Sequence, residues 1–264
     1  MKIFQKRKNW AWPYIIFLIL LVILPLVLIG IYAFTDLDGH FTLRNFALFF
    51  SKSEAVNTFI YSIAIALITT IICLLLGYPA AYVMAMRSFR TPAVMALLFI
   101  LPMWINFLLR TIATVELFHM FNLPLGEGAL LFGLSYDFLP FMIYPIYNTL
   151  QKMDVSLLEA AKDLGATRTQ TFLKVVLPLS MPGIYSGIVM VFMPTVSTFA
   201  ISELLTHNKI TLFGSLIQRS FGEGGILMWN YGAALSLIML VIIGATSFFG
   251  QSESDTGSQK GGLV

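Results

Sequence analysis

The sequence predicts an all-α, polytopic membrane protein, built as a bundle of six transmembrane helices. Of its 264 residues, 58% are hydrophobic and only 11% are charged. Soluble domains carry about 25% charged residues. The mean hydropathy of the chain is +0.85. A water-soluble protein of this length could not bury so much apolar surface, so the solvent around most of the chain must be lipid.

Six apolar segments are long enough to cross a bilayer, which takes about 20 predominantly apolar residues. The first, at about 11–34, follows a basic cluster but exceeds the roughly 7–15 apolar residues of a cleaved signal peptide, so we interpret it as an uncleaved span. The others lie at about 58–86, 92–109, 131–150, 175–201 and 226–249. Together they form one transmembrane domain over residues 1–250. Residues 251–264 are rich in Ser, Gly and charged side chains, and we expect a disordered tail.

Lys and Arg residues are divided unequally between the two sides of this arrangement. Eleven of the 16 lie in the termini, in the loop between the second and third spans, and in the loop 151–174 between the fourth and fifth spans. The remaining five lie in the other loops. Because positive residues concentrate on the cytoplasmic side, we expect a multi-pass protein of the bacterial inner membrane with both termini in the cytoplasm.

Other classes of function find little support in the composition. The net charge of +3 is too small and too scattered to predict a nucleic-acid partner. Cys73 is the only cysteine and lies in an apolar run, which is typical of a buried structural residue. The three histidines, at positions 40, 119 and 207, have no second ligand at metal-site spacing. We therefore expect neither a metal site nor a catalytic residue.

The loop 151–174 predicts a short amphipathic helix. Asp154 or Ser156 can cap its start, and Gly165 can end it because glycine accepts the left-handed conformation of a C-cap. A second amphipathic turn, 169–174, leads into the fifth span. Such a helix could dock in the groove of another protein. The alternative, a helix lying on lipid, is disfavoured by its acidic residues because cytoplasmic leaflets are anionic.

The same loop contains a longer pattern. It reads Glu159-Ala160-Ala161, three residues, Gly165, nine residues, and then Val-Val-Leu-Pro over 175–178. This resembles the EAA motif of the binding-protein-dependent ABC importer permeases, with Val in place of Ile at position 175. The resemblance implies a type I ABC importer permease architecture, in which the loop is a coupling helix seated in a cleft of an ATP-binding subunit. It assigns the contact with that subunit to Glu159, Ala160, Ala161 and Gly165, together with their neighbours Leu158, Asp163 and Leu164.

The resemblance also implies partners. They are two ATP-binding subunits, a second homologous permease subunit and an extracytoplasmic binding protein. The chain has no GxxxxGK[ST] phosphate loop. ATP would therefore be bound and hydrolysed by the partner, and this subunit would be a non-catalytic translocation subunit without a cofactor.

Three further segments, 76–86, 101–111 and 139–154, resemble the permeases of spermidine/putrescine importers, which implies a polyamine substrate and a polyamine-binding protein as partner. Sulfate, thiosulfate and iron permeases share parts of these segments, so another solute of the same family is the alternative. A secondary transporter driven by an ion gradient is the alternative from another class. It would need ionisable residues near the bilayer midplane, and the spans hold few.

A path for polyamines requires carboxylates and aromatic faces. The candidates from the sequence are Trp104, Asn106, Glu116, Asp137 and Glu203. The face of a Trp can hold an ammonium group for about 0.5–2 kcal/mol, although a Trp at this depth is equally suited to anchor a helix at the membrane interface. The carboxylates could equally be solvated at helix ends. Arg110 would repel a cation unless it pairs with Glu116 or Asp137.

Overall fold

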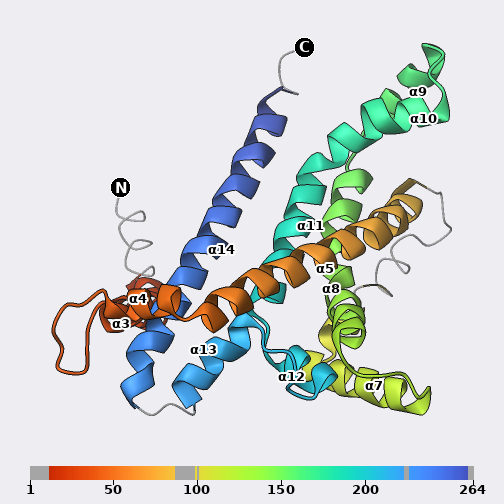
Figure 1. The fold of residues 1–264 in the computed structure, drawn as a ribbon. Coiled ribbons are helices and arrows are strands. Elements are labelled where there is room, and N and C mark those ends of the chain that lie inside the picture. Colours follow the sequence, from red (N-terminus) through yellow and green to blue (C-terminus); the bar gives the residue numbers. More distant parts are fainter. Residues whose placement is uncertain (1–11, 87–98, 100, 223–225, 261–264) are drawn as a thin grey trace, which may run out of the picture. The chain divides into compact units, whose positions relative to one another are not determined.

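The computed structural model describes residues 12–86, 99, 101–222 and 226–260. Within them the regular structure is helical, apart from one isolated bridge between Thr35 and Phe41. This confirms the all-α prediction. The chain divides into two compact units: unit 1 comprises residues 1–57 and 216–242, and unit 2 comprises residues 58–215 and 243–264. Figure 1 traces the helices of both along the sequence.

Within the described residues, five helices are long and apolar enough to cross a membrane. They are Trp12–Ala33, Ser53–Ala85, Glu127–Gln151, Arg168–Ser197 and Met228–Thr246. They correspond to the first, second, fourth, fifth and sixth predicted spans. The third predicted span, 92–109, includes residues 92–98 and 100, which lie outside the described part of the chain. The multi-pass architecture is therefore confirmed, and the count of six stays a prediction.

The described part of unit 1 begins with a helix that is apolar around its whole circumference. It comprises α2 (Trp12–Leu18), the π-helical turn η1 (Ile19–Ile23) and α3 (Leu24–Ala33). Its large apolar side chains are mostly exposed. A helix with this pattern is stable only where the surroundings are also apolar, so this exposed surface suits lipid.

The C-terminal end of α3 is held by side-chain amides. Asn230 of α14 (Ile226–Lys260) donates from its side chain to the carbonyls of Tyr32 and Thr35, at 3.1 and 2.6 Å. Asn45 of α4 (Arg44–Ser51) donates to the carbonyl of Ala33 at 3.0 Å. These amides satisfy carbonyls that have no partner inside the helix. They thereby join three helices of unit 1.

Unit 2 is built around two helices that run side by side, α8 (Glu127–Gln151) and α11 (Leu177–Ser197) (Figure 1). Their crossing depends on small residues. A Cβ atom on Gly183 would lie 2.8 Å from the carbonyl oxygen of Pro145, and one on Gly187 would lie 2.7 Å from the sulfur of Met142. Small residues allow such close backbone approach between membrane helices.

Three further helices of unit 2 pack around this pair. They are α5 (Ser53–Met86, from residue 58 on), α7 (Phe107–Met120) and α12 (Ala200–Thr206). Helix α13 (Phe213–Gly222) begins in unit 2 and continues into unit 1, and α14 belongs to unit 2 from Ile243 on. Two apolar clusters form the core of the unit: one around Met142 and Ile146, and one around Leu130 and Leu134.

Two boundaries differ from the predictions. The described part of the third predicted span is interrupted: Leu101–Trp104 forms the 3-10 turn η2, and α7 begins only at Phe107 because the Asn106 side chain caps it. The tail predicted to be disordered from residue 251 instead continues α14 to Lys260. Extending a helix that already exists needs no new nucleus, so a polar sequence can follow it.

Candidate functional site

The segment that carries the EAA motif, residues 154–176 (the EAA segment), begins with a capped helix. In α9 (Val155–Asp163), the Asp154 carboxylate accepts a hydrogen bond from the Ser156 backbone N–H at 2.9 Å. This bond is the main reason why the pKa of Asp154 lies below its ordinary value, and a hydrogen bond from the Ser156 side chain contributes a smaller part. Of the two predicted caps, the structure uses Asp154.

The end of α9 is a left-handed glycine turn. Gly165 has a φ of +77°. Its N–H donates to the Lys162 carbonyl at 2.9 Å, and the N–H of Ala166 donates to the Ala161 carbonyl at 3.0 Å. These are the bonds of a glycine C-cap, which satisfy the last carbonyls of a helix. The predicted position of the helix end is confirmed.

The side chains of the EAA motif divide into two sets. Leu158 packs against the apolar cluster around Met142, and Ala161 is half-buried. Leu164 is 89% exposed. The other exposed members are Glu159, Ala160, Asp163 and Gly165. The inner set anchors α9 on unit 2, and the exposed set forms a small acidic and apolar surface that a second protein can contact.

A second short helix, α10 (Arg168–Thr171), follows with a capping box that the sequence analysis missed. The Thr167 hydroxyl accepts from the Gln170 N–H at 3.3 Å, and the Gln170 side-chain oxygen accepts from the Thr167 N–H at 2.9 Å. The signal was present in the sequence as Thr-x-x-Gln. The box fixes the direction in which the chain leaves α9.

The EAA segment joins α11 through an aromatic contact. Residues Phe172–Val176 form the π-helical turn η3, which continues into α11. The ring of Phe172 meets the rings of Tyr78 and Tyr82 of α5 edge to face, with centroids 5.9 and 5.5 Å apart. The Tyr78 hydroxyl in turn lies 3.0 Å from that of Ser180. The EAA segment is thus in contact with α5 and continuous with α11.

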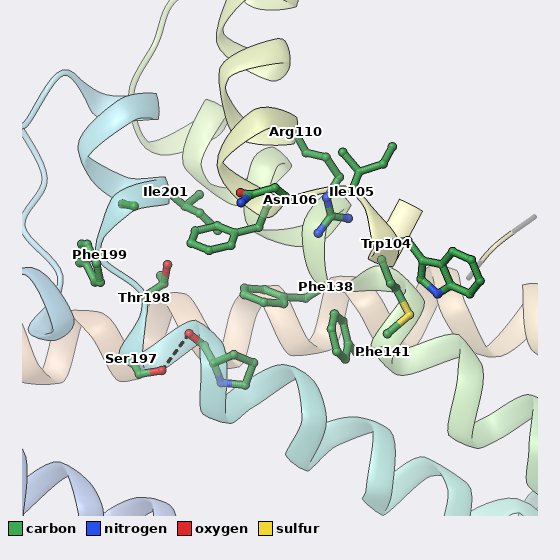
Figure 2. Close-up of a pocket in the computed structure, with 14 residues that line it drawn as sticks. Trp104, Ile105, Asn106, Arg110, Phe138, Phe141, Ser197, Thr198, Phe199 and Ile201 are labelled. Atoms are coloured by element: carbon green, nitrogen blue, oxygen red, sulfur yellow. Dashed lines mark hydrogen bonds between the residues drawn. The ribbon is translucent and has the colours of Figure 1, made fainter. Parts of the chain in front are cut away.

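Unit 2 also holds a cavity of about 600 Å³ at two interruptions of its helices. One interruption is the break between η2 and α7, at Ile105 and Asn106; the other is the break between α11 and α12, at Thr198 and Phe199. Irregular backbone at membrane depth is tolerated where it lines a cavity or is buried in protein. Figure 2 shows the aromatic side chains Phe138 and Phe141 of α8 between the two breaks.

Two of the predicted path residues line this cavity. Trp104 is 78% exposed, and Asn106 uses its side-chain oxygen to accept from the N–H of Leu108 at 2.9 Å. Arg110 lines it as well. Glu116 is exposed on α7 and Glu203 is half-buried on α12, and neither lines the cavity.

Asp137 lies behind the cavity wall in a buried ion pair. Its Oδ1 is 3.2 Å from the Nε of Arg110, and its Oδ2 is 3.3 Å from the Thr111 hydroxyl. The side chains of Arg110 and Asp137 are 6% and 2% exposed. The contact between the Arg110 Nε and the Asp137 Oδ1 is an ion pair that lacks the geometry of a hydrogen bond. The structure thus selects Asp137, and not Glu116, from the two partners that the sequence offered for Arg110.

A group of possible metal ligands lies in unit 1, where the sequence analysis expected no second ligand near a histidine. Ligand atoms of Asp36, Asp38 and His40 lie within 4.8 Å of one another. The backbone N–H groups of Asp38 and His40 both donate to the Asp36 carboxylate, at 3.0 and 2.9 Å. This Asx-type turn accounts for the arrangement without an ion.

Comparison with known proteins places the chain in a family of transport proteins. The chain is 35% identical over 250 residues to the spermidine/putrescine transport system permease protein PotB of Escherichia coli, a match that covers 86% of this chain and 90% of that protein. It is 33% identical over 273 residues to PotB of Haemophilus influenzae, with 94% of each covered.

Solved structures share the fold. A bacterial alginate ABC transporter in complex with an alginate-bound periplasmic protein aligns with a TM-score of 0.71 at 16% identity, covering 96% of this chain and 95% of that one. The MetNI methionine ABC transporter aligns with a TM-score of 0.61 at 17% identity, covering 76% and 95%. Residues 74–252 match the family described as binding-protein-dependent transport system inner membrane component. The chain belongs to this family and is a multi-pass transport permease.

Proposed function

We propose that the chain is the translocation subunit of an ABC importer for polyamines. The observation that carries the substrate class is its similarity to the PotB permeases over nearly the whole length of both chains. The cavity is compatible with this substrate, because five of its fourteen lining residues are aromatic and aromatic faces hold ammonium groups. Another solute of the same family is the competing proposal.

The proposed partners follow from the EAA segment and the family. Two ATP-binding subunits drive transport, and one of them receives the exposed face of α9. A second homologous permease completes the path, and an extracytoplasmic binding protein delivers the substrate. The excess of Lys and Arg in the termini and in the loop 151–174 supports an orientation with both termini and α9 in the cytoplasm.

Family membership argues against a secondary transporter. The buried pair of Arg110 and Asp137 is the type of feature that such a transporter would contain. However, the chain belongs to a family of binding-protein-dependent transport components, and an exposed helix with a capped start and a glycine end is suited to receive a driving subunit.

The experiment is uptake into vesicles by the complete complex, reconstituted with its own ATP-binding subunit, second permease and binding protein. Labelled spermidine or putrescine should accumulate with ATP and not without it, and labelled sulfate should not. Accumulation of sulfate in place of both polyamines would overturn the substrate class. Glu159→Ala should reduce uptake and weaken binding of the ATP-binding subunit, whereas Glu54→Ala, at an exposed acid of α5, should change neither.

A further inference from the structure

The inference concerns the ion pair behind the cavity, and it rests on the proposed function. Arg110 of α7 and Asp137 of α8 are in contact at 3.2 Å, and both side chains are more than nine-tenths buried. Removing two charges from water is costly, and a buried pair contributes little net stability compared with apolar residues of the same size. Stability alone therefore gives no reason for charges at this position.

The two members of the pair differ in their access to the cavity. Arg110 lines it, and Figure 2 shows its guanidinium group directed toward the space between Asn106 and Phe138. Asp137 does not line it and is only 1% exposed. Among the described residues that form the cavity wall, Arg110 is the one that carries a charge. A ligand in the cavity would therefore meet the arginine first, with the carboxylate behind it.

A lone arginine at this position would exclude a polycation. Charges interact strongly in a site that is shielded from water, and a ligand with several ammonium groups is repelled in proportion to its charge. The carboxylate of Asp137 cancels the charge of Arg110 at close range, and the other thirteen lining residues are uncharged, five of them aromatic. The guanidinium group also lies over the face of Tyr136, whose ring centroid is 5.9 Å from the Arg110 Cζ.

We propose that Asp137 is a specificity-determining residue: by neutralising Arg110 behind the cavity wall, it allows the cavity to accept linear polyamines, including those of higher charge. Arg110 lines the cavity, while its Nη1 is buried and has no hydrogen-bond partner among the described residues. The pair thus sets the net charge of the wall at zero. Loss of the carboxylate makes the wall positive, and loss of the guanidinium makes it negative.

The test uses the reconstituted complex with saturating, substrate-loaded binding protein, so that the rate reports on the permease. Uptake of spermidine, a trication, is divided by uptake of putrescine, a dication. Asp137→Asn should lower spermidine uptake by about tenfold and putrescine uptake by less, so that the ratio falls. Arg110→Gln should raise the ratio. The double variant R110Q/D137N should return the ratio to within about twofold of the wild type.

A structural role would give a different pattern. If the pair only stabilised the fold, each single variant would reduce the amount of assembled complex and leave the ratio unchanged, and that result would overturn the proposal. Asp137→Glu, which keeps the charge, should keep the ratio, and Glu116→Gln, at an exposed acid of α7, is the matched control. If the complex with Asp137→Asn does not assemble, the spermidine-to-putrescine uptake ratio of Arg110→Gln tests the proposal. An unchanged ratio in that variant would overturn it. If the wild-type complex takes up neither polyamine, the proposed function is refuted. This outcome is distinct from failure of the inference, which is judged only from the uptake ratios of the variants.

Discussion

The Tyr78 hydroxyl of α5 lies 3.0 Å from the Ser180 hydroxyl of α11. Because Ser180 itself donates to the Leu177 carbonyl at 2.8 Å, the tyrosine is the donor in this pair. The contact joins two predicted spans that are about a hundred residues apart in sequence. It lies next to Phe172, where the EAA segment enters α11.

Tyr78→Phe and Ser180→Ala should each lower the free energy of unfolding by about 0.5–1.5 kcal/mol, the usual contribution of a neutral hydrogen bond. The double variant should lose less than the sum, because both changes remove the same bond. Denaturant unfolding in detergent measures these energies. Tyr82→Phe is the control, since its ring also meets Phe172. Strict additivity would show that the two hydroxyl groups do not interact.

Gly165→Ala should destabilise the end of α9. A residue with a Cβ atom is disfavoured by about 1–2 kcal/mol in the left-handed conformation that Gly165 adopts. Faster hydrogen exchange at the last amides of α9, and weaker binding of the ATP-binding subunit, should both be observed. Gly222→Ala is the control, because Gly222 has ordinary backbone angles and open space around its Cα. An equal effect at both positions would contradict the role of the left-handed turn.

The cap at Asp154 should depend on pH. Its pKa is lower in the folded protein than in the unfolded chain, so the cap is fully present above the unfolded pKa and is lost as pH falls through the folded pKa. Protection of the Ser156 amide from exchange, corrected for the intrinsic rate, should decrease over that acidic range. Asp154→Asn keeps an oxygen acceptor without a titrating group and should remove the pH dependence. Unchanged protection of the wild type at acid pH would be inconsistent with a carboxylate cap.

Gly183→Ala should weaken the crossing of α8 and α11. The added Cβ would lie 2.6 Å from the Thr149 hydroxyl and 2.8 Å from the Pro145 carbonyl, and a backbone atom cannot move aside cheaply. Overpacking of this kind costs about 1–3 kcal/mol. A lower thermal midpoint in detergent is the expected result. Gly244→Ala of α14, where nothing lies within 4 Å, should leave the midpoint unchanged or raise it.

The start and the end of α9 were predictable because their determinants are local. A carboxylate at position 154 and a glycine at position 165 dictate where α9 starts and stops, whatever surrounds them. The all-α fold was predictable for a similar reason, since long apolar runs leave the helix as the structure that satisfies its own backbone in lipid.

The cavity was not predictable, because its determinants are distant in sequence. The break at Phe199 follows no glycine, and α11 continues through Pro182 and Pro194, where a kink was more to be expected. The pairing of Arg110 was left open between Glu116 and Asp137. Only the packing of α7 against α8 shows that Asp137 is buried beside the guanidinium group while Glu116 remains exposed.

The π-helical turn η3 has a consequence for how this protein can vary. Each residue of an α-helix turns the chain by about 100°, and a π turn accommodates one extra residue in a continuous helix. A single deletion in Phe172–Val176 would convert the turn to α-helix and rotate the exposed face of α9 by about a quarter turn or more about the axis of α11. Substitutions between Gly165 and Pro178 should therefore be tolerated far better than insertions or deletions. A change in the length of this segment would turn the exposed face of α9 away from the proposed ATP-binding subunit.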